Sequence, residues 1–222
     1  GIGNLPSGDK DPFALRRHAL GVIRMLVEKD LALDVTALVQ SAVPAFGDRV
    51  TDASAALVDF MFERLAGSLR EQGYSAQEVE SVLALRPQRL GDVAKRLAAV
   101  RAFAALPESP ALAAANKRIS NILKKTDDVD AHVSPVLLQE AAEKALYAAM
   151  QTVLPQAQSQ WEAGDYTASL QSLAALRAPV DAFFEDVMVN AEALDLRLNR
   201  LGLLKSLHLA MNRVADLSKL AA

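Results

Sequence analysis

The sequence predicts an all-α protein built as two consecutive helical bundles without a sheet. Apolar residues make up 51% of the chain but aromatic residues only 5%, and alanine and leucine dominate, which favours helix over strand. Apolar side chains recur every three to four residues along most of the chain, the spacing of amphipathic helices. No segment shows the alternation of a half-buried strand. At 222 residues, one large or two small domains are expected.

The first half of the sequence, residues 1–106, predicts a helical body of five helices. Asp11 suits an N-cap and Pro12 the first helical position, so a helix is expected from Pro12 to Lys29. Ser75 and Glu78 have the spacing of a capping box for the fourth helix. The other three helices are expected at 35–46, from Thr51 or Asp52 to Gly73, and at 90–106. In the third helix the residues expected to face the core are Leu57, Phe60, Met61 and Leu65.

Two prolines, Pro107 and Pro110, mark the expected boundary between the first domain and a second one over residues 107–222. Ser109 is expected to cap the first helix of this domain, at 111–125. A long helical stretch over residues 135–162, bent at Pro155, follows. The remaining helices are expected at 166–176, 179–189 and 193–217.

The last of these helices is apolar on two opposite faces, which is typical of a central helix in a bundle. Arg197 and Arg200 interrupt the apolar pattern near its start, where the helix dipole opposes a cation. Two interpretations stay open. The arginines pair with Glu185 or Asp186 across the preceding turn, or they present their guanidinium groups to phosphates or base edges.

The sequence offers no catalytic or metal site. His18, His132 and His208 lie far apart, without a metal-ligand spacing, and His208 is expected to pack in the core. There is no cysteine, no glycine-rich phosphate loop and no nucleophile elbow. No apolar run approaches the roughly 20 residues of a membrane span, so neither a membrane partner nor a membrane location is expected.

A cationic face stands out on the helix expected at 111–125. Its polar side carries Lys117, Arg118, Asn121, Lys124 and Lys125 without an acid among them. Lysines in a last helical turn are usually only solvated, whereas a phosphate-binding face requires such a concentration of positive charge. Because the net charge of the whole chain is −3, any contact with nucleic acid must come from a local patch of this kind.

Four stretches together resemble the beta subunit of the bacterial heterotetrameric glycyl-tRNA synthetase. They contain the motifs DPFALRR, ANKRISNIL, FFEDVMV and RLNRLGLL and cover residues 8–17, 113–123, 181–189 and 197–204. The resemblance implies that the chain is a C-terminal fragment of a cytoplasmic ligase. Its second half would be an anticodon-binding domain similar to that of arginyl-tRNA synthetase. No DNA partner is implied.

The resemblance also implies that a separate alpha subunit activates glycine with ATP and magnesium in an α2β2 tetramer. This fragment would hold no cofactor and no catalytic residue, and would bind the anticodon arm of glycine tRNA. On this basis we expect phosphate contacts from Lys117, Arg118, Lys124 and Lys125. Contacts closer to the bases are expected from Asn121, Arg197, Asn199 and Arg200.

Two further questions stay open at this level. Trp161, Tyr147 and Tyr166 offer stacking surfaces for single-stranded RNA, although core or rim packing is the more frequent role of such residues. Phe183 and Phe184 are adjacent, so one of them must leave the core. The alternative function is a helical scaffold or subunit-interaction module without direct RNA contact.

Overall fold

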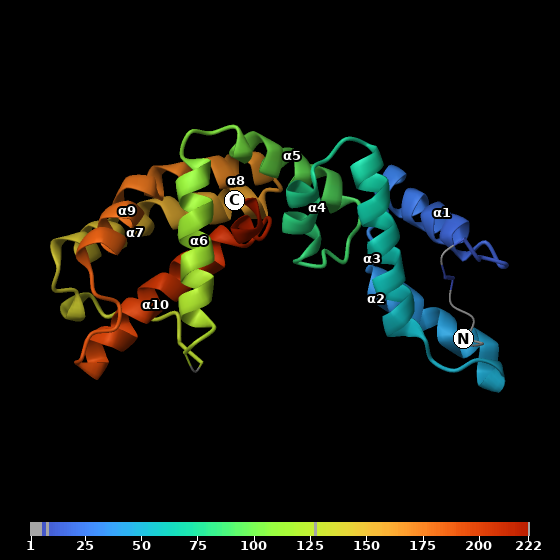
Figure 1. The fold of residues 1–222 in the computed structure, drawn as a ribbon, viewed down its shortest axis with the longest axis horizontal. Coiled ribbons are helices and arrows are strands. Elements are labelled where there is room, and N and C mark those ends of the chain that lie inside the picture. The colour runs from blue at the N-terminus through green and yellow to red at the C-terminus, as the bar shows by residue number, and fades with distance from the viewer. Residues whose placement is uncertain (1–5, 8, 127, 222) are drawn as a thin grey trace. The chain divides into compact units, whose positions relative to one another are not determined.

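A computed structural model describes residues 6–7, 9–126 and 128–221, and these residues are helical with connecting loops and no sheet. The predicted all-α class is confirmed. The chain divides into two compact units, Gly1–Lys95 and Arg96–Ala222 (Figure 1). This division falls inside helix α5 (Asp92–Ala104), upstream of the boundary expected at residues 106–107, and that domain boundary stays a prediction. Gly8, at the start of one resembling stretch, lies outside the described residues.

The first unit is organised around its longest helix, α3 (Ser54–Glu71). Helix α3 packs against α1 (Leu15–Glu28), α2 (Val35–Ala42) and α4 (Ala76–Leu83). A 3-10 segment, η1 (Val43–Arg49), follows α2. The core between these helices is aliphatic, and its most buried members include Ile23, Leu26, Val35, Val58, Leu65, Val79, Val82 and Leu90.

The predicted caps of the first unit are largely confirmed. Ser75 and Glu78 form the capping box of α4, with both reciprocal hydrogen bonds present. The Asp34 side chain accepts a hydrogen bond from the Ala37 amide at the start of α2. The first helix begins later than expected, at Leu15 instead of Pro12. Asp11 nevertheless caps it, because its carboxylate accepts hydrogen bonds from the Leu15 and Arg16 amides at 2.8 and 3.0 Å.

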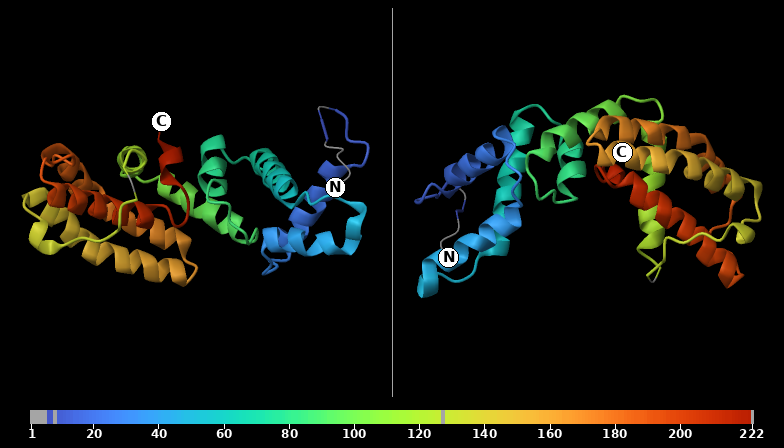
Figure 2. Two further views of the ribbon diagram at one scale, coloured as in Figure 1. Left: turned by 90° about the horizontal axis from the view of Figure 1, so that it is seen from below. Right: turned by 180° about the vertical axis from the view of Figure 1, so that it is seen from behind.

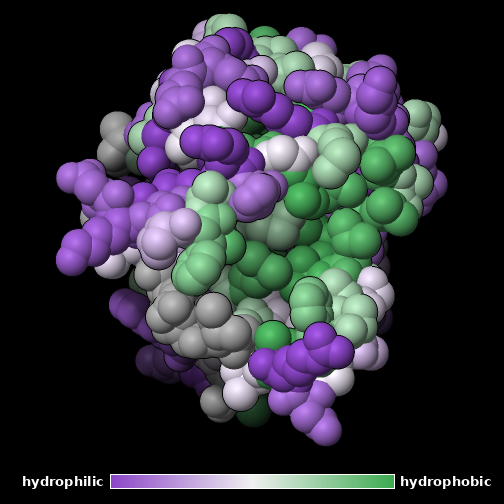
Figure 3. All heavy atoms as spheres, turned by 90° about the vertical axis from the view of Figure 1, so that its right-hand side faces the viewer, coloured by the Kyte–Doolittle hydropathy of each residue, from purple (hydrophilic) through white to green (hydrophobic). Residues whose placement is uncertain are grey.

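The inward face of α3 differs from the one expected. Leu57 is 44% exposed, whereas Met61 and Leu65 are buried as expected. The buried stripe includes Val58 in place of Leu57, because the face of α3 that packs against the other helices is rotated by one residue from the expected face. Leu57 therefore joins a set of exposed apolar side chains in this unit, and Figure 3 shows an apolar patch on one of its faces. The exposed set comprises Phe13, Leu15, Met25, Leu31, Leu33, Phe46 and Leu57.

The second unit packs its helices around α7 (Ala141–Glu162) and α10 (Leu194–Met211). Helix α7 contacts α8 (Tyr166–Ser172), the 3-10 segment η3 (Leu173–Leu176), α9 (Arg177–Asp186) and α10. Helix α6 (Ser109–Leu123) contacts α9, α10 and the C-terminal 3-10 segment η4 (Leu217–Leu220), as Figure 2 shows from two sides. A further 3-10 segment, η2 (Pro135–Leu137), precedes α7.

Helix α10 is central, as its two apolar faces predicted, but only beyond its first turns. Leu203, Leu204 and Leu207 are completely buried, whereas Leu194 and Leu198 are 57% and 50% exposed. Figure 1 shows the start of α10 extending past the helices that cover its middle. The helix also ends at Met211 instead of residue 217, because the chain turns there before η4.

Other expected helix boundaries need correction as well. Helix α9 ends at Asp186 instead of residue 189, because Val187 is extended. Ser109 does not cap α6, because the helix begins at Ser109 itself and Glu108 occupies the N-cap position. The stretch after Ser134 starts with the 3-10 segment η2, and α7 begins only at Ala141. In the part of the chain that the structure describes, no helix is long and apolar enough to cross a membrane.

Candidate nucleic-acid interface

Helix α6 presents the predicted cations on its exposed side. Leu112, Ala113 and Ile119 bury the opposite side against the bundle, so helical periodicity turns the cations outward. The exposed residues of this side are Lys117, Arg118, Asn121, Lys124 and Lys125. All five were expected to contact RNA, and the structure places them along two adjacent hollows, of which Lys117 and Asn121 line both.

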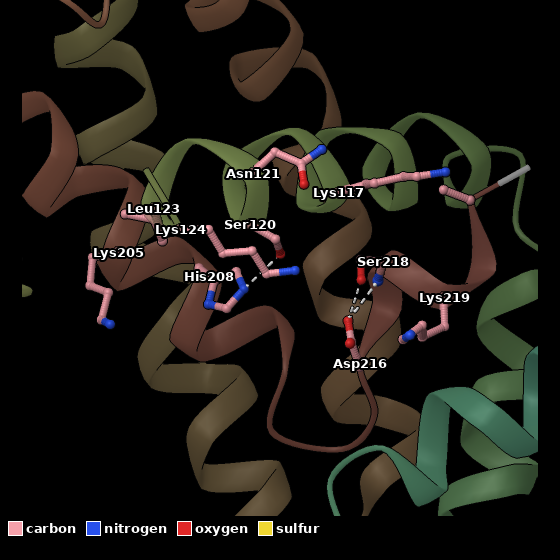
Figure 4. Close-up of a pocket in the computed structure, with 11 residues that line it drawn as sticks. Lys117, Ser120, Asn121, Leu123, Lys124, Lys205, His208, Asp216, Ser218 and Lys219 are labelled. Atoms are coloured by element: carbon pink, nitrogen blue, oxygen red, sulfur yellow. Dashed lines mark hydrogen bonds between the residues drawn. The ribbon is translucent and has the colours of Figure 1, made fainter. Parts of the chain in front are cut away.

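The first hollow is a cleft of about 710 Å³ between α6, α10 and the C-terminal segment (Figure 4). We call it the basic cleft. The charged and titratable side chains that line it are Lys117, Lys124, Lys205, Lys219, His208 and Asp216. Lys205 and Lys219 were missed from the sequence, because nothing in the spacing of α10 or of the tail shows that they approach α6.

A pair of amides brings the walls of the basic cleft together. Asn116, completely buried on α6, donates to the Asn212 side chain at 2.8 Å, and Asn212 donates back at 3.1 Å. The Asn212 side chain also accepts a hydrogen bond from the Leu217 amide. These bonds join α6 to the end of α10 and to the start of η4, so Lys219 is held on the same cleft as Lys117.

His208 lines the basic cleft and is half-buried, which corrects the expectation of a packed core residue. Its Nε2 lies 2.9 Å from the Ser120 hydroxyl. Burial lowers the pKa of His208, and the positive charges of Lys205 and Lys124 lower it further, although the Asp216 carboxylate acts in the opposite direction. The imidazole is therefore neutral at pH 7.

The second hollow, of about 520 Å³, adjoins the basic cleft along α6 and shares Lys117 and Asn121 with it. We call it the Arg118 hollow, and its polar lining is Lys117, Arg118, Asn121, Lys125, Thr126 and Asn190. The Arg118 guanidinium carbon lies 4.2 Å from the centre of the Phe184 ring, a cation–π contact. Phe183 is completely buried and Phe184 is not, so Phe184 is the phenylalanine that leaves the core, as one of the two had to.

Arg200 is buried inside the second unit. Its Nε donates to the Glu143 carboxylate at 2.6 Å, and its NH1 group donates to the Met188 carbonyl at 2.7 Å. The ion pair expected with Glu185 or Asp186 is thus formed with Glu143 instead, which a sequence reading could not foresee across such a separation. Arg200 thereby connects α10 to the start of α7 and to the linker after α9. Because the side chain is buried, its guanidinium contacts protein atoms.

Glu143, the partner of Arg200, is completely buried and also caps α7. Its second carboxylate oxygen accepts hydrogen bonds from the Gln139 and Glu140 amides at 2.9 and 2.8 Å. Burial acts to raise the pKa of Glu143, but the bonds from Arg200 and these two amides outweigh it and hold the pKa below its ordinary value. The carboxylate is therefore ionised in the folded protein.

Asn199 is also buried, and its side chain is used by the fold. Its amide accepts from the Ser134 backbone N–H at 2.7 Å and donates to the Ser134 carbonyl at 3.2 Å. One turn later, a side chain at Gly202 would collide with the His132 carbonyl. The Ser206 hydroxyl then donates to the Ala131 carbonyl at 3.0 Å. Three successive turns of α10 thus hold the chain at residues 131–134.

The remaining candidates are placed separately. Arg197 is half-buried in the first turn of α10 and pairs with no carboxylate among the described residues. Tyr166 lies under the Arg96 guanidinium, 5.1 Å from carbon to ring centre. Tyr147 and Trp161 are half-buried on α7 and line neither hollow. In the described part of the chain, no three His, Asp or Glu side chains are grouped to hold a metal ion.

Two family models match this chain. The family model of the glycyl-tRNA synthetase beta subunit matches residues 1–84, and that of the DALR anticodon-binding domain matches residues 112–219. The chain belongs to the glycyl-tRNA synthetase beta subunit family. Both hollows lie on residues of the stretch that matches the DALR anticodon-binding domain, except for the tail residue Ala221.

Relatives within this family are similar over the whole of this chain. The glycine–tRNA ligase beta subunit of Polaromonas naphthalenivorans is 77% identical over 223 residues, and that of Paracidovorax citrulli is 75% identical over 221 residues. The protein of the same name from Dechloromonas aromatica is 65% identical over 225 residues. The chain spans 31 to 32% of the length of these relatives.

Proposed function

We propose that this chain binds the anticodon arm of glycine tRNA, and that the basic cleft holds the RNA backbone. The observation that supports the proposal most strongly is the cleft itself. Among the described residues that line it, four are lysines and one carries a carboxylate, although the net charge of the whole chain is negative. That carboxylate, Asp216, is engaged by the amide and hydroxyl of Ser218 at 3.1 and 2.6 Å.

The chemistry of the cleft suits phosphodiester groups. Ammonium groups around a hollow concentrate positive potential, and binding of a phosphate chain to them releases counterions. The Ser120 hydroxyl adds a donor for phosphate or ribose oxygens. A cleft of about 710 Å³ accommodates a short stretch of backbone, as a folded loop presents.

The activity of the whole enzyme enters the proposal through the relatives. Glycine–tRNA ligase activity, with glycine activated by a separate alpha subunit using ATP and magnesium in an α2β2 tetramer, is proposed for the assembly that contains this chain. In that assembly the present chain supplies tRNA binding and no catalytic group.

The proposal is tested by RNA binding to the full-length ligase assembly at two salt concentrations. Glycine tRNA is compared with the same tRNA carrying altered anticodon bases. We expect tighter and salt-sensitive binding of the natural anticodon. Equal binding of both RNAs would contradict anticodon recognition, and absence of binding would favour the scaffold alternative.

Substitutions in the cleft sharpen the same test. Lys124→Gln and Lys205→Gln should each weaken binding and reduce the slope of log affinity against log salt by about 1. Lys144→Gln is the matched control, because Lys144 is an exposed lysine of α7 that lines neither hollow. A control that weakens binding as much as the cleft variants would remove the cleft from the interface.

A second role, contact with other protein surfaces, has an observation of its own in the first unit. Among its described residues, seven large apolar side chains are exposed, which is typical of a surface that another protein segment covers. This role concerns the first unit alone, so it is compatible with RNA binding by the second unit. It becomes the alternative function only if the second unit binds no tRNA.

A further inference from the structure

We infer that the Arg118 hollow is a base-binding site, in which one unpaired nucleobase stacks on the Arg118 guanidinium. The inference rests on the proposed function, because it takes an RNA loop as the ligand. It changes the role of Arg118 from the expected phosphate contact to a stacking surface. The two adjacent hollows along α6 then bind different parts of the RNA, with the backbone in the basic cleft and a base in the Arg118 hollow.

The first argument is the support under the guanidinium. Arginine is a planar cation, and planar guanidinium groups stack on nucleobases in RNA recognition. The Phe184 ring lies beneath Arg118 at 4.2 Å from ring centre to guanidinium carbon. Phe184 is itself held from behind by the buried Phe183 ring in an edge-to-face contact at 5.6 Å. Arg118 is exposed and makes no ion pair within the described part of the chain.

The second argument is the polar lining around this stack. Asn121, one turn after Arg118, carries an exposed amide, and Asn190 faces the same hollow from the linker after α9. Side-chain amides read base edges, because each carries both donors and an acceptor. Lys125, just after the end of α6, also lines the hollow and suits a neighbouring phosphate.

The third argument is that the wall bearing Asn190 is fixed. Val187 and Val189 are buried while Met188 and Asn190 are exposed, so the linker alternates like an extended strand. The buried Arg200 guanidinium holds the Met188 carbonyl at 2.7 Å. Arg200 is therefore a positioning residue for this hollow and not a direct base contact. A preformed wall lowers the entropy lost when a base is bound.

The test combines a change in the protein with a change in the RNA. The probe is the anticodon stem–loop of glycine tRNA, in which each loop nucleotide is replaced in turn by an abasic one, bound to the full-length ligase assembly. With the unchanged protein, we expect one abasic position to weaken binding about 10-fold, the effect of losing one stacked base. Arg118→Lys keeps the charge but removes the planar group, and should weaken binding of the intact loop about 10-fold.

The decisive result is the combination. With Arg118→Lys the sensitive abasic position should lose its effect, while the salt dependence stays that of the unchanged protein. Phe184→Leu should reduce the same abasic effect, because it removes the ring that supports the guanidinium. Arg177→Lys, on an exposed arginine of α9 outside both hollows, is the matched control and should change neither quantity. Circular dichroism confirms that each variant is folded.

The outcomes separate the two proposals. If Arg118→Lys binds the intact loop as tightly as the unchanged protein, or if the abasic effect persists in it at full size, the stacking role is overturned. If the stem–loop binds but no loop position is sensitive, this inference fails while backbone binding stands. If the stem–loop does not bind at all, the proposed function fails with it.

Discussion

The two units are stabilised in different ways. The first unit packs aliphatic stripes, and its ion pairs Arg86–Asp59 and Arg89–Asp30 lie at the surface with side chains 42 to 68% exposed. The second unit adds polar contacts inside its core, above all Arg200–Glu143 and Asn116–Asn212. Apolar stripes determine which helices pack, whereas buried polar contacts also determine where helix ends and loops lie. The first unit also fixes a loop by a polar contact, between Thr36 and Gln88, but the second unit, which holds the candidate RNA interface, does so with a buried ion pair.

The largest expected effect comes from breaking the buried ion pair. Arg200→Met should lower the free energy of unfolding of the second unit by about 3–5 kcal/mol, because Glu143 is left buried without its cationic partner. Urea unfolding followed by the fluorescence of Trp161, the single tryptophan, measures the change. The matched change in the first unit, Asp59→Asn at the exposed Arg86 pair, should alter stability by no more than about 1 kcal/mol by circular dichroism. Equal effects would contradict the contrast between the units.

A smaller effect of opposite sign in the two units is expected from adding one methyl group. Gly202→Ala should destabilise the second unit by about 1–3 kcal/mol, because the new side chain meets the His132 carbonyl and displaces the chain at residues 131–134. Gly67→Ala, inside α3 of the first unit, meets no atom and should stabilise that unit by about 0.5–1 kcal/mol through helix propensity. Thermal unfolding of both variants tests the pair. A neutral Gly202→Ala would show that the contact with residues 131–134 is not tight in solution.

This contrast also explains which parts of the molecule could be predicted from the sequence. Local signals were reliable: the Ser75–Glu78 capping box and the two apolar faces of α10 are both present. Arg200 and Asn199 were expected near the bases on the basis of the family resemblance. Their partners lie far away in the sequence, at Glu143 and Ser134, and only the fold brings them together.

The residues that make up the basic cleft could not be predicted from the sequence either, because they too are far apart along the chain. Lys117 and Lys124 belong to one helical face, which periodicity reveals. Lys205 and Lys219 join them because α10 and η4 pack against α6, where Asn116 and Asn212 bond across 96 residues of sequence. Helical spacing predicts which residues share one face of a helix. It cannot predict which second helix completes a site.

The smallest expected effect is a pH dependence of RNA binding at the basic cleft. His208 is neutral at pH 7 because burial, Lys205 and Lys124 lower its pKa against the opposing effect of Asp216. Phosphate in the cleft favours the protonated imidazole, so binding takes up a proton and the affinity should rise as the pH falls from 7 through the lowered pKa. One added charge of this kind strengthens binding about 2- to 5-fold.

His208→Gln should remove this pH dependence while keeping a side chain that can hydrogen-bond to Ser120. His132→Gln, at an exposed histidine outside the cleft, should leave it unchanged, since His132 faces no lysine of the cleft. The affinity of the full-length assembly for glycine tRNA, measured between pH 7.5 and pH 5.5 at constant salt, distinguishes the two variants. If His208→Gln keeps the pH dependence, the phosphate does not reach the imidazole. The RNA backbone would then contact the lysines of the cleft without approaching His208. In that case the buried polar contacts of the second unit would position the lysines at the edge of the interface, and the imidazole would take no part in binding.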